Sequence, residues 1–140
     1  MPDQLERLLN RARARLARLE PHDARDAMHR GAILVDIRPE FQRRQDGEIP
    51  GAIVVERNHL EWRLHPASSG RIAEAVEPAV HWIVICDEGY ASSLAAVTLQ
   101  MIGLSRATDV AGGFQAWRAA GLPVDARGTL TPPRLAPRVS

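Results

Sequence analysis

The single cysteine of this 140-residue chain, Cys86, ends an apolar run and opens the small, polar stretch CDEGYASS (86–93). A lone cysteine often packs as a small hydrophobe, because free cysteine is among the most buried residue types. A thiol held over a helix N-terminus is instead a candidate nucleophile, since the unpaired N–H groups and partial positive charge there favour the thiolate. The rest of the sequence decides between these interpretations.

The loop after the cysteine has the composition of an anion-binding turn. Gly89 stands in its middle, and a glycine with positive φ lets successive N–H groups point inward as a nest. Ser92 is predicted to be the N-cap of the next helix. Asp87 and Glu88 would disfavour a thiolate and repel an anionic substrate if their carboxylates pointed inward. We expect them to point outward and line the rim.

The elements that position this loop alternate along the chain. Apolar runs of strand length occur at 32–37, 52–55, 81–86 and, more weakly, 107–110. Helices are predicted at 22–30, where Gly31 follows the last residue, and at 70–76, 92–102 and 114–120. Near-continuous apolar strands that alternate with helices predict a parallel α/β sheet buried on both faces.

Ligands of open parallel sheets bind beyond the carboxyl ends of the strands. Asp36 closes the first predicted strand, Arg38 follows it, and Cys86 closes the third. If these strands are neighbours, the three side chains share one edge, where we expect Asp36 to bond adjacent loops and Arg38 to shape the field at the rim. Arg57 and Arg63 lie in a segment that could return to this edge, so they are candidate anion binders.

The aromatic residues are expected to pack or to gate the loop, and the histidines are not expected to bind a metal. Trp62 and Trp117 are expected to be packing residues, and Tyr90 is a candidate gate because it belongs to the loop. The five histidines show no metal-ligand spacing, so neither a metal nor a cofactor is expected.

Residues 1–20 are predicted to form an N-terminal amphipathic helix that precedes the main domain. Its helical span is placed at 3–19, with Asp3 as N-cap and Pro21 closing the segment. One face carries an apolar stripe and the other carries arginines that we interpret as a solvated face. The stripe is Leu5, Leu9, Ala12, Leu16 and Leu19, and the arginines are Arg7, Arg11, Arg15 and Arg18. The main domain is placed at 21–124, and the Pro-rich tail 125–140 is predicted to be disordered or loosely attached.

The composition excludes several classes of protein. The chain is 45% hydrophobic and 25% charged with a net charge of +1, which argues against a general nucleic-acid binder. One cysteine cannot form an internal disulfide. No apolar run is long enough to span a membrane, and no secretory signal is recognised, so a cytoplasmic location is expected.

Three segments, in order, make residues 22–124 resemble the single-domain rhodanese (sulfurtransferase) family. They are VDIRPEFQRRQDGEIPGA (35–52), CDEGYASS (86–93) and AGGFQAWRAAGLPV (111–124). The resemblance implies a three-layer α/β domain with a central parallel sheet and helices on both faces. It also implies that Cys86 takes a sulfur atom from a small-molecule donor such as thiosulfate and passes the persulfide sulfur to a thiol or cyanide. The persulfide-binding loop would be Asp87, Glu88, Gly89, Tyr90, Ala91 and Ser92.

The sequence departs from the family pattern at two positions. Ala91 stands where many members carry arginine, and Glu48 stands where histidine is common. With acids at 87 and 88, thiosulfate is expected to be a poor donor, and a persulfide carried by glutathione or a protein is the alternative. A non-enzymatic module that binds a partner or relays sulfur remains the second hypothesis. Phosphatase-like relatives use Cys-x5-Arg, whereas Ser92 stands six places after Cys86.

Overall fold

A parallel β-sheet forms the centre of the protein. The structure is a computed structural model that describes residues 3–126 and the strand at 134–135. Within these residues the sheet has five strands in the order β4-β3-β1-β2-β5, and every neighbouring pair is parallel. The strands are β1 (Ile33–Asp36), β2 (Ile53–Val54), β3 (Trp82–Ile85), β4 (Thr108–Asp109) and β5 (Arg134–Leu135). The parallel α/β prediction is confirmed.

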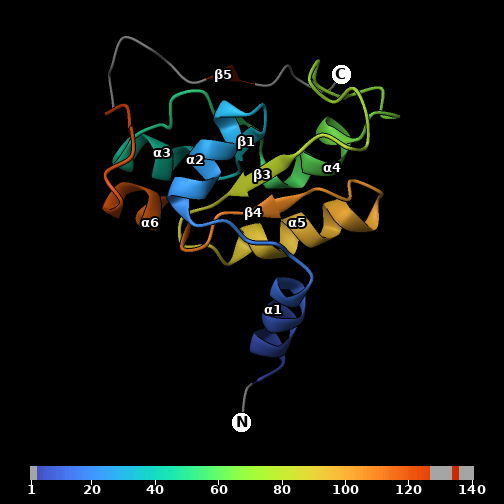
Figure 1. Cartoon of the computed structure of the whole chain (residues 1–140), viewed down its shortest axis with the longest axis horizontal. Helices are drawn as coiled ribbons and strands as arrows, with labels where there is room; N and C mark the ends of the chain where they lie inside the picture. Colours follow the sequence, from blue (N-terminus) through green and yellow to red (C-terminus); the bar gives the residue numbers. More distant parts are fainter. Residues whose placement is uncertain (1–2, 127–133, 136–140) are drawn as a thin grey trace.

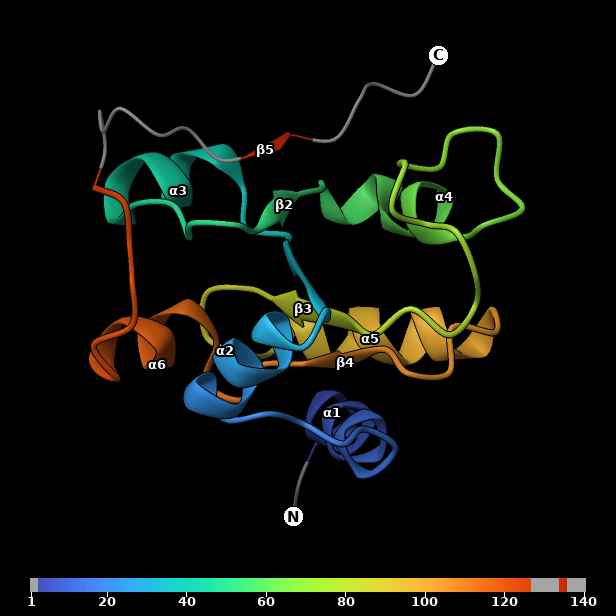
Figure 2. The same cartoon turned by 45° about the horizontal axis from the view of Figure 1, so that its top comes forward.

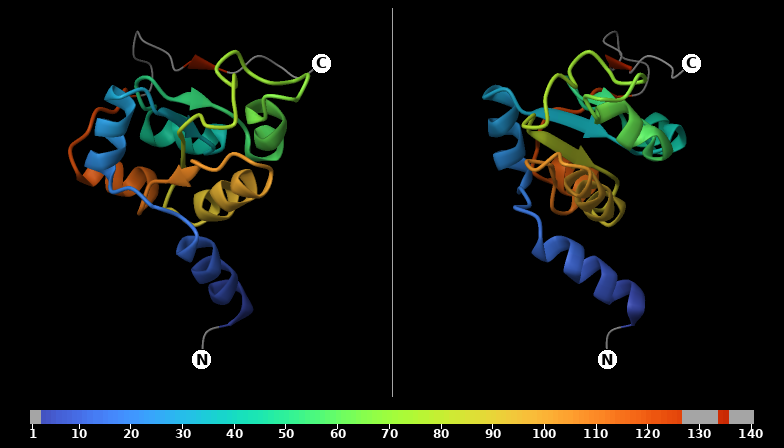
Figure 3. Two further views of the ribbon diagram at one scale, coloured as in Figure 1. Left: turned by 45° about the vertical axis from the view of Figure 1, so that its right-hand side comes forward. Right: turned by 90° about the vertical axis from the view of Figure 1, so that its right-hand side faces the viewer.

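Helices cover both faces of the sheet and complete three layers (Figures 1 and 3). The helices are α1 (Gln4–Ala14), α2 (Pro21–His29), α3 (Glu40–Asp46), α4 (Leu60–Leu64), α5 (Ala91–Met101) and α6 (Gly113–Ala119), with a 3₁₀ turn, η1 (Arg57–His59). Because side chains alternate along a strand, Trp82 and Val84 pack with α4 and α5 on one face. Ile83 and Ile85 pack with α2 and α6 on the other. No helix of the described residues is long and apolar enough to cross a membrane.

The four predicted strands and four of the five predicted helices are present, but the helix predicted at 70–76 is wrong. The chain there forms turns: the Ile72 N–H donates to the Arg63 carbonyl and the Ala75 N–H to that of Ile72. Ile72 and Ala75 are buried, so they attach the segment to the core without helical pairing. The short helices α3 and α4 were not predicted.

The N-terminal helix is shorter than predicted. The Asp3 carboxylate caps it by accepting from the Glu6 N–H at 2.8 Å, but α1 ends at Ala14 rather than near residue 19. The chain then runs beside β4, where the Leu19 N–H donates to the Asp109 carbonyl and the Ala111 N–H to the Leu19 carbonyl. This edge pairing takes the place of helical hydrogen bonds. Figure 2 shows α1 beneath α5, outside the three layers.

The predicted apolar stripe is only partly covered, and one arginine was misplaced. Ala12 is buried, whereas Leu5 is 70% exposed. Arg7, Arg11 and Arg15 are exposed as predicted. Arg18 instead forms an ion pair with the buried carboxylate of Asp109, because the chain is extended where a helix was expected.

Two parts of the predicted C-terminal tail pair with the rest of the chain. Asp125 pairs with Glu48 through two backbone hydrogen bonds of 2.7 and 2.9 Å, and Arg134–Leu135 pairs with β2. Pairing along a strand edge needs no apolar periodicity, so the sequence did not reveal it. Residues 127–133 and 136–140 of the predicted tail lie outside the described residues.

Candidate active site

Neighbouring strands bring the acid, the arginine and the thiol to one edge of the sheet. β1 lies beside β3, and Asp36 is in register with Ile85, directly before Cys86. The carboxyl ends of the two strands therefore meet, as the sequence predicted. Cys86 faces the α5 side of the sheet and is only 7% exposed.

The sulfur of Cys86 accepts two backbone hydrogen bonds from the loop that follows it. The Gly89 N–H lies 3.2 Å from Sγ and the Ser92 N–H lies 3.3 Å from it. The second donor is in the first turn of α5, where N–H groups have no partner within the helix. The sulfur therefore occupies the acceptor position of a helix cap, an arrangement that favours a negatively charged sulfur.

The helix starts one residue earlier than predicted, so Ser92 is not its N-cap. Tyr90 is the capping residue and makes no side-chain capping bond. Ser92 supplies its N–H to the sulfur, while its hydroxyl donates to the Asp109 carboxylate at 2.8 Å. The Cys86 sulfur, and not a serine hydroxyl, accepts the hydrogen bond from the N–H in the first turn of α5.

The loop backbone is also held by the start of α6. The Phe114 N–H donates to the Cys86 carbonyl at 2.8 Å, and the Gln115 N–H donates to the Asp87 carbonyl at 3.0 Å. Gly113 makes this approach possible: its φ is +60°, and a Cβ there would lie 2.5 Å from the Cys86 oxygen. Glycine at position 113 is therefore required for the contact between α6 and the loop.

Asp36 and Arg38 form a buried pair beneath the site. Arg38 Nη2 donates to the Asp36 carboxylate at 2.8 Å and to the Gly47 carbonyl at 2.9 Å. The guanidinium also lies 3.8 Å from the centre of the Phe114 ring. These contacts connect β1, the end of α3 and α6, so the pair fixes the loops around the thiol.

A cavity of about 380 Å³ opens beside Cys86. Arg57 lines it, and its Nη1 contacts the Glu61 carboxylate at 3.0 Å. Arg63, the other candidate anion binder, does not line the cavity; it is 5% exposed and donates to the Gly70 carbonyl at 3.2 Å.

Residues 60, 63 and 64 form the buried side of α4. That spacing leaves Trp62 60% exposed, so its predicted packing role is wrong.

The loop side chains lie at the rim of this cavity. Glu88 is exposed, and Asp87 is half-buried with its carboxylate accepting from the Gln115 amide at 2.9 Å. Tyr90 is 58% exposed and Ala91 is also exposed. All four line the cavity. Trp117, in contrast, is buried and donates to the Pro123 carbonyl, as expected of a packing residue.

The sequence analysis missed three residues that support the loop from the side of α1. Arg13 and Arg18 both donate to the Gly89 carbonyl, at 2.8 and 3.1 Å. Asp109 is fully buried and accepts from Arg18, Ser92 and the neighbouring Ser93. The extended segment after α1 makes the contacts of Arg18 possible, and no sequence pattern indicated it.

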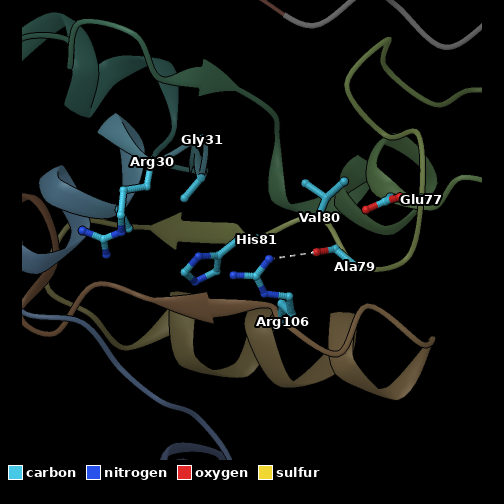
Figure 4. Close-up of a pocket in the computed structure, with 9 residues that line it drawn as sticks. Arg30, Gly31, Glu77, Ala79, Val80, His81 and Arg106 are labelled. Atoms are coloured by element: carbon cyan, nitrogen blue, oxygen red, sulfur yellow. Dashed lines mark hydrogen bonds between the residues drawn. The ribbon is translucent and has the colours of Figure 1, made fainter.

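A second cavity, of about 310 Å³, lies at the opposite ends of the strands (Figure 4). His81, which directly precedes β3, lies between Arg30 and Arg106 in this view. Partial burial and the two nearby guanidinium charges, Arg106 and then Arg30, lower the pKa of His81. This cavity shares no lining residue with the one at Cys86.

The fold and the sulfur-centred loop define an α/β protein with a cysteine at the carboxyl edge of its sheet. The model of the Rhodanese-like domain family matches residues 20–120. The chain therefore belongs to the rhodanese-like family. A protein named thiosulfate sulfurtransferase GlpE, from Pseudomonas savastanoi, is 32% identical over 102 residues, which cover 73% of this chain and 87% of that protein.

Solved structures share the fold. A protein of unknown function from Rhodopseudomonas palustris, described as a possible tyrosine phosphatase, has a TM-score of 0.78 and 32% identity, and the match covers 89% of this chain and 99% of that one. The polysulfide-sulfur transferase homodimer of Wolinella succinogenes has a TM-score of 0.70 at 23% identity, covering 89% of each chain, and supports the fold alone.

Proposed function

We propose that the protein is a sulfurtransferase that carries sulfur as a persulfide on Cys86. The observation that carries this proposal is the pair of backbone N–H groups on Sγ, in a cavity large enough for a small donor. A preorganised cradle of this kind stabilises a sulfur anion without reorganisation during the reaction. The relatives named thiosulfate sulfurtransferase support the reaction class.

The transfer proceeds in two displacements. The Cys86 thiolate attacks the outer sulfur of thiosulfate; the sulfur–sulfur bond of the donor breaks, and its electron pair leaves with sulfite. A cyanide or thiolate acceptor then attacks the outer sulfur of the persulfide, and the electron pair of that bond returns to Cys86. Charge and atoms balance in each step, no metal or redox cofactor takes part, and ping-pong kinetics follow.

The charges around the cavity bear on the choice of donor. Arg57 is the cationic side chain that can reach a bound anion, but Glu61 already neutralises part of its charge. Arg38 is committed to Asp36, while Asp87 and Glu88 place negative charge at the rim. The cavity is therefore poorly matched to a small dianion, and we propose a glutathione or protein persulfide as the better donor.

The experiment is intact-mass spectrometry of the reduced protein after separate incubation with thiosulfate and with glutathione persulfide. The wild type should gain one sulfur atom and lose it on addition of cyanide, whereas Cys86→Ala should gain none. Comparison of sulfur uptake from the two donors at equal concentration tests the proposed preference for a persulfide over thiosulfate. A reduced wild-type protein that gains no sulfur from either donor would refute the enzymatic function and favour a partner-binding module.

The phosphatase description given to the Rhodopseudomonas palustris protein finds little support in this site. The cysteine-dependent phosphatase loop needs an arginine six places after the nucleophile to clamp the phosphate. Here that position is Ser92, whose hydroxyl donates to buried Asp109. Aryl phosphate hydrolysis by the wild-type protein, absent in Cys86→Ala, would contradict this assignment.

A further inference from the structure

Two arginines from outside the family-matched region reach the backbone of the Cys86 loop. Arg13 belongs to α1, and Arg18 to the extended segment after it, whereas the family match begins at residue 20. Both side chains donate to the carbonyl oxygen of Gly89, which also lies 3.0 Å from the Ser93 hydroxyl. The Arg13 guanidinium further lies over the Tyr90 ring, 5.4 Å from its centre.

Gly89 is the residue at which such contacts have the most effect. Its N–H is one of the two donors to the Cys86 sulfur. Its φ is +89°, and a Cβ there would lie 2.9 Å from the Gly112 nitrogen and 3.1 Å from Arg18 Nη2. A glycine is therefore required, yet glycine has more conformational freedom than any other residue. The guanidinium groups restrict that freedom by fixing the carbonyl of the residue whose N–H contacts the sulfur.

The two arginines differ in how their charges are balanced. Arg18 is paired through Nε and Nη2 with the Asp109 carboxylate, at 2.9 and 3.1 Å. Arg13 has no carboxylate in ion-pair contact among residues 3–126, and its Nε donates instead to the Ser93 hydroxyl. The positive charge of Arg13 therefore acts on the loop itself, and Arg18 mainly fixes its geometry.

We propose that Arg13 and Arg18 are positioning residues for Cys86: they hold the Gly89 carbonyl, keep the Gly89 N–H on the sulfur and favour the sulfur anion. The N-terminal segment is then a working part of the active site. The consequence for sulfur transfer rests on the proposed function, but the effect on the thiol itself does not.

Arg13 offers the sharper test, because Arg18→Ala would leave the buried Asp109 carboxylate without its ion pair. Cys86 is the single cysteine, so alkylation by iodoacetamide reports on this thiol alone. The variants are Arg13→Ala, Arg13→Lys and the matched control Arg11→Ala, which removes an equal charge from an exposed position of the same helix. Alkylation rates are measured against pH, together with melting temperature, sulfur uptake, kcat and KM.

Arg13→Ala should move the midpoint of the alkylation–pH profile upward and lower kcat/KM about three- to tenfold, the size expected for the net contribution of one ordinary hydrogen bond. Arg13→Lys should restore part of both, since it keeps the charge but not the fork geometry. Arg11→Ala should match the wild type. If Arg13→Ala does not fold, Arg13→Lys compared with Arg11→Ala carries the same test.

The outcomes separate the two proposals. An Arg13→Ala profile that coincides with that of Arg11→Ala, even with a lower melting temperature, would overturn the positioning role. A shifted profile in a protein whose wild type takes no sulfur from any donor would refute the proposed function and leave the positioning role standing.

Discussion

The backbone N–H of Ser92 lies 3.3 Å from the sulfur of Cys86, so the nucleophile candidate and the start of α5 are a single unit. The sulfur satisfies a helix N–H that would otherwise lack a partner, and the helix in turn supplies a donor to the sulfur.

Arg57→Ala should raise the KM for thiosulfate about three- to tenfold with kcat little changed, because the side chain would bind the donor equally in the ground and transition states. Steady-state kinetics at constant salt measure this effect. Arg44→Ala is the control, since Arg44 forms an exposed pair with Glu40 and does not line the cavity. Equal KM values for the two variants would show that Arg57 does not bind the donor.

Glu88→Gln should lower the KM for thiosulfate, by about threefold at low salt, because an exposed negative charge is removed from the rim. The difference from the wild type should shrink as salt is added, since the interaction is screened. Titration of the rate with thiosulfate at two ionic strengths measures it. A KM difference that does not depend on salt would mean that Glu88 acts by contact rather than by charge.

Gly113→Ala should destabilise the protein strongly, because a Cβ there meets the Cys86 carbonyl at 2.5 Å. Gly121→Ala is the matched control: its φ is also positive, at +75°, but nothing lies within 4 Å of the added Cβ. The free energy of unfolding from denaturant titration should fall about 1–3 kcal/mol further for Gly113→Ala than for Gly121→Ala. Equal losses would show that the α6 contact does not constrain the loop.

Stability should fall in acid through His81. Its folded-state pKa is lowered from 6.5, so the unfolded chain binds the proton more readily, and protonation favours unfolding as the pH falls below that value. The wild type should therefore lose stability relative to His81→Gln between about pH 7 and pH 5. Denaturant titrations across that range measure the difference. Parallel curves for the two proteins would contradict the prediction.

The sequence predicted the features that depend on local pattern. The apolar runs identified β1 to β4, and the residues after them placed Asp36, Arg38 and Cys86 at one edge of the sheet. It failed where tertiary contacts decide. Backbone pairing with β4 ended α1 at Ala14 and turned Arg18 toward Asp109. Two side-chain hydrogen bonds to the Gly89 carbonyl, from Arg13 and Arg18, come from residues more than 70 positions away, a separation at which no spacing rule applies.

The parallel bridge between Leu19 and Val110 closes the outer edge of β4. An open strand edge carries unpaired N–H and C=O groups and is a template for pairing with another chain. The segment that bears Arg18 therefore also protects the sheet against edge-to-edge association. Shortening the chain from its N-terminus past Leu19 would remove that protection, and self-association of the truncated protein would accompany the loss of support for the Cys86 loop.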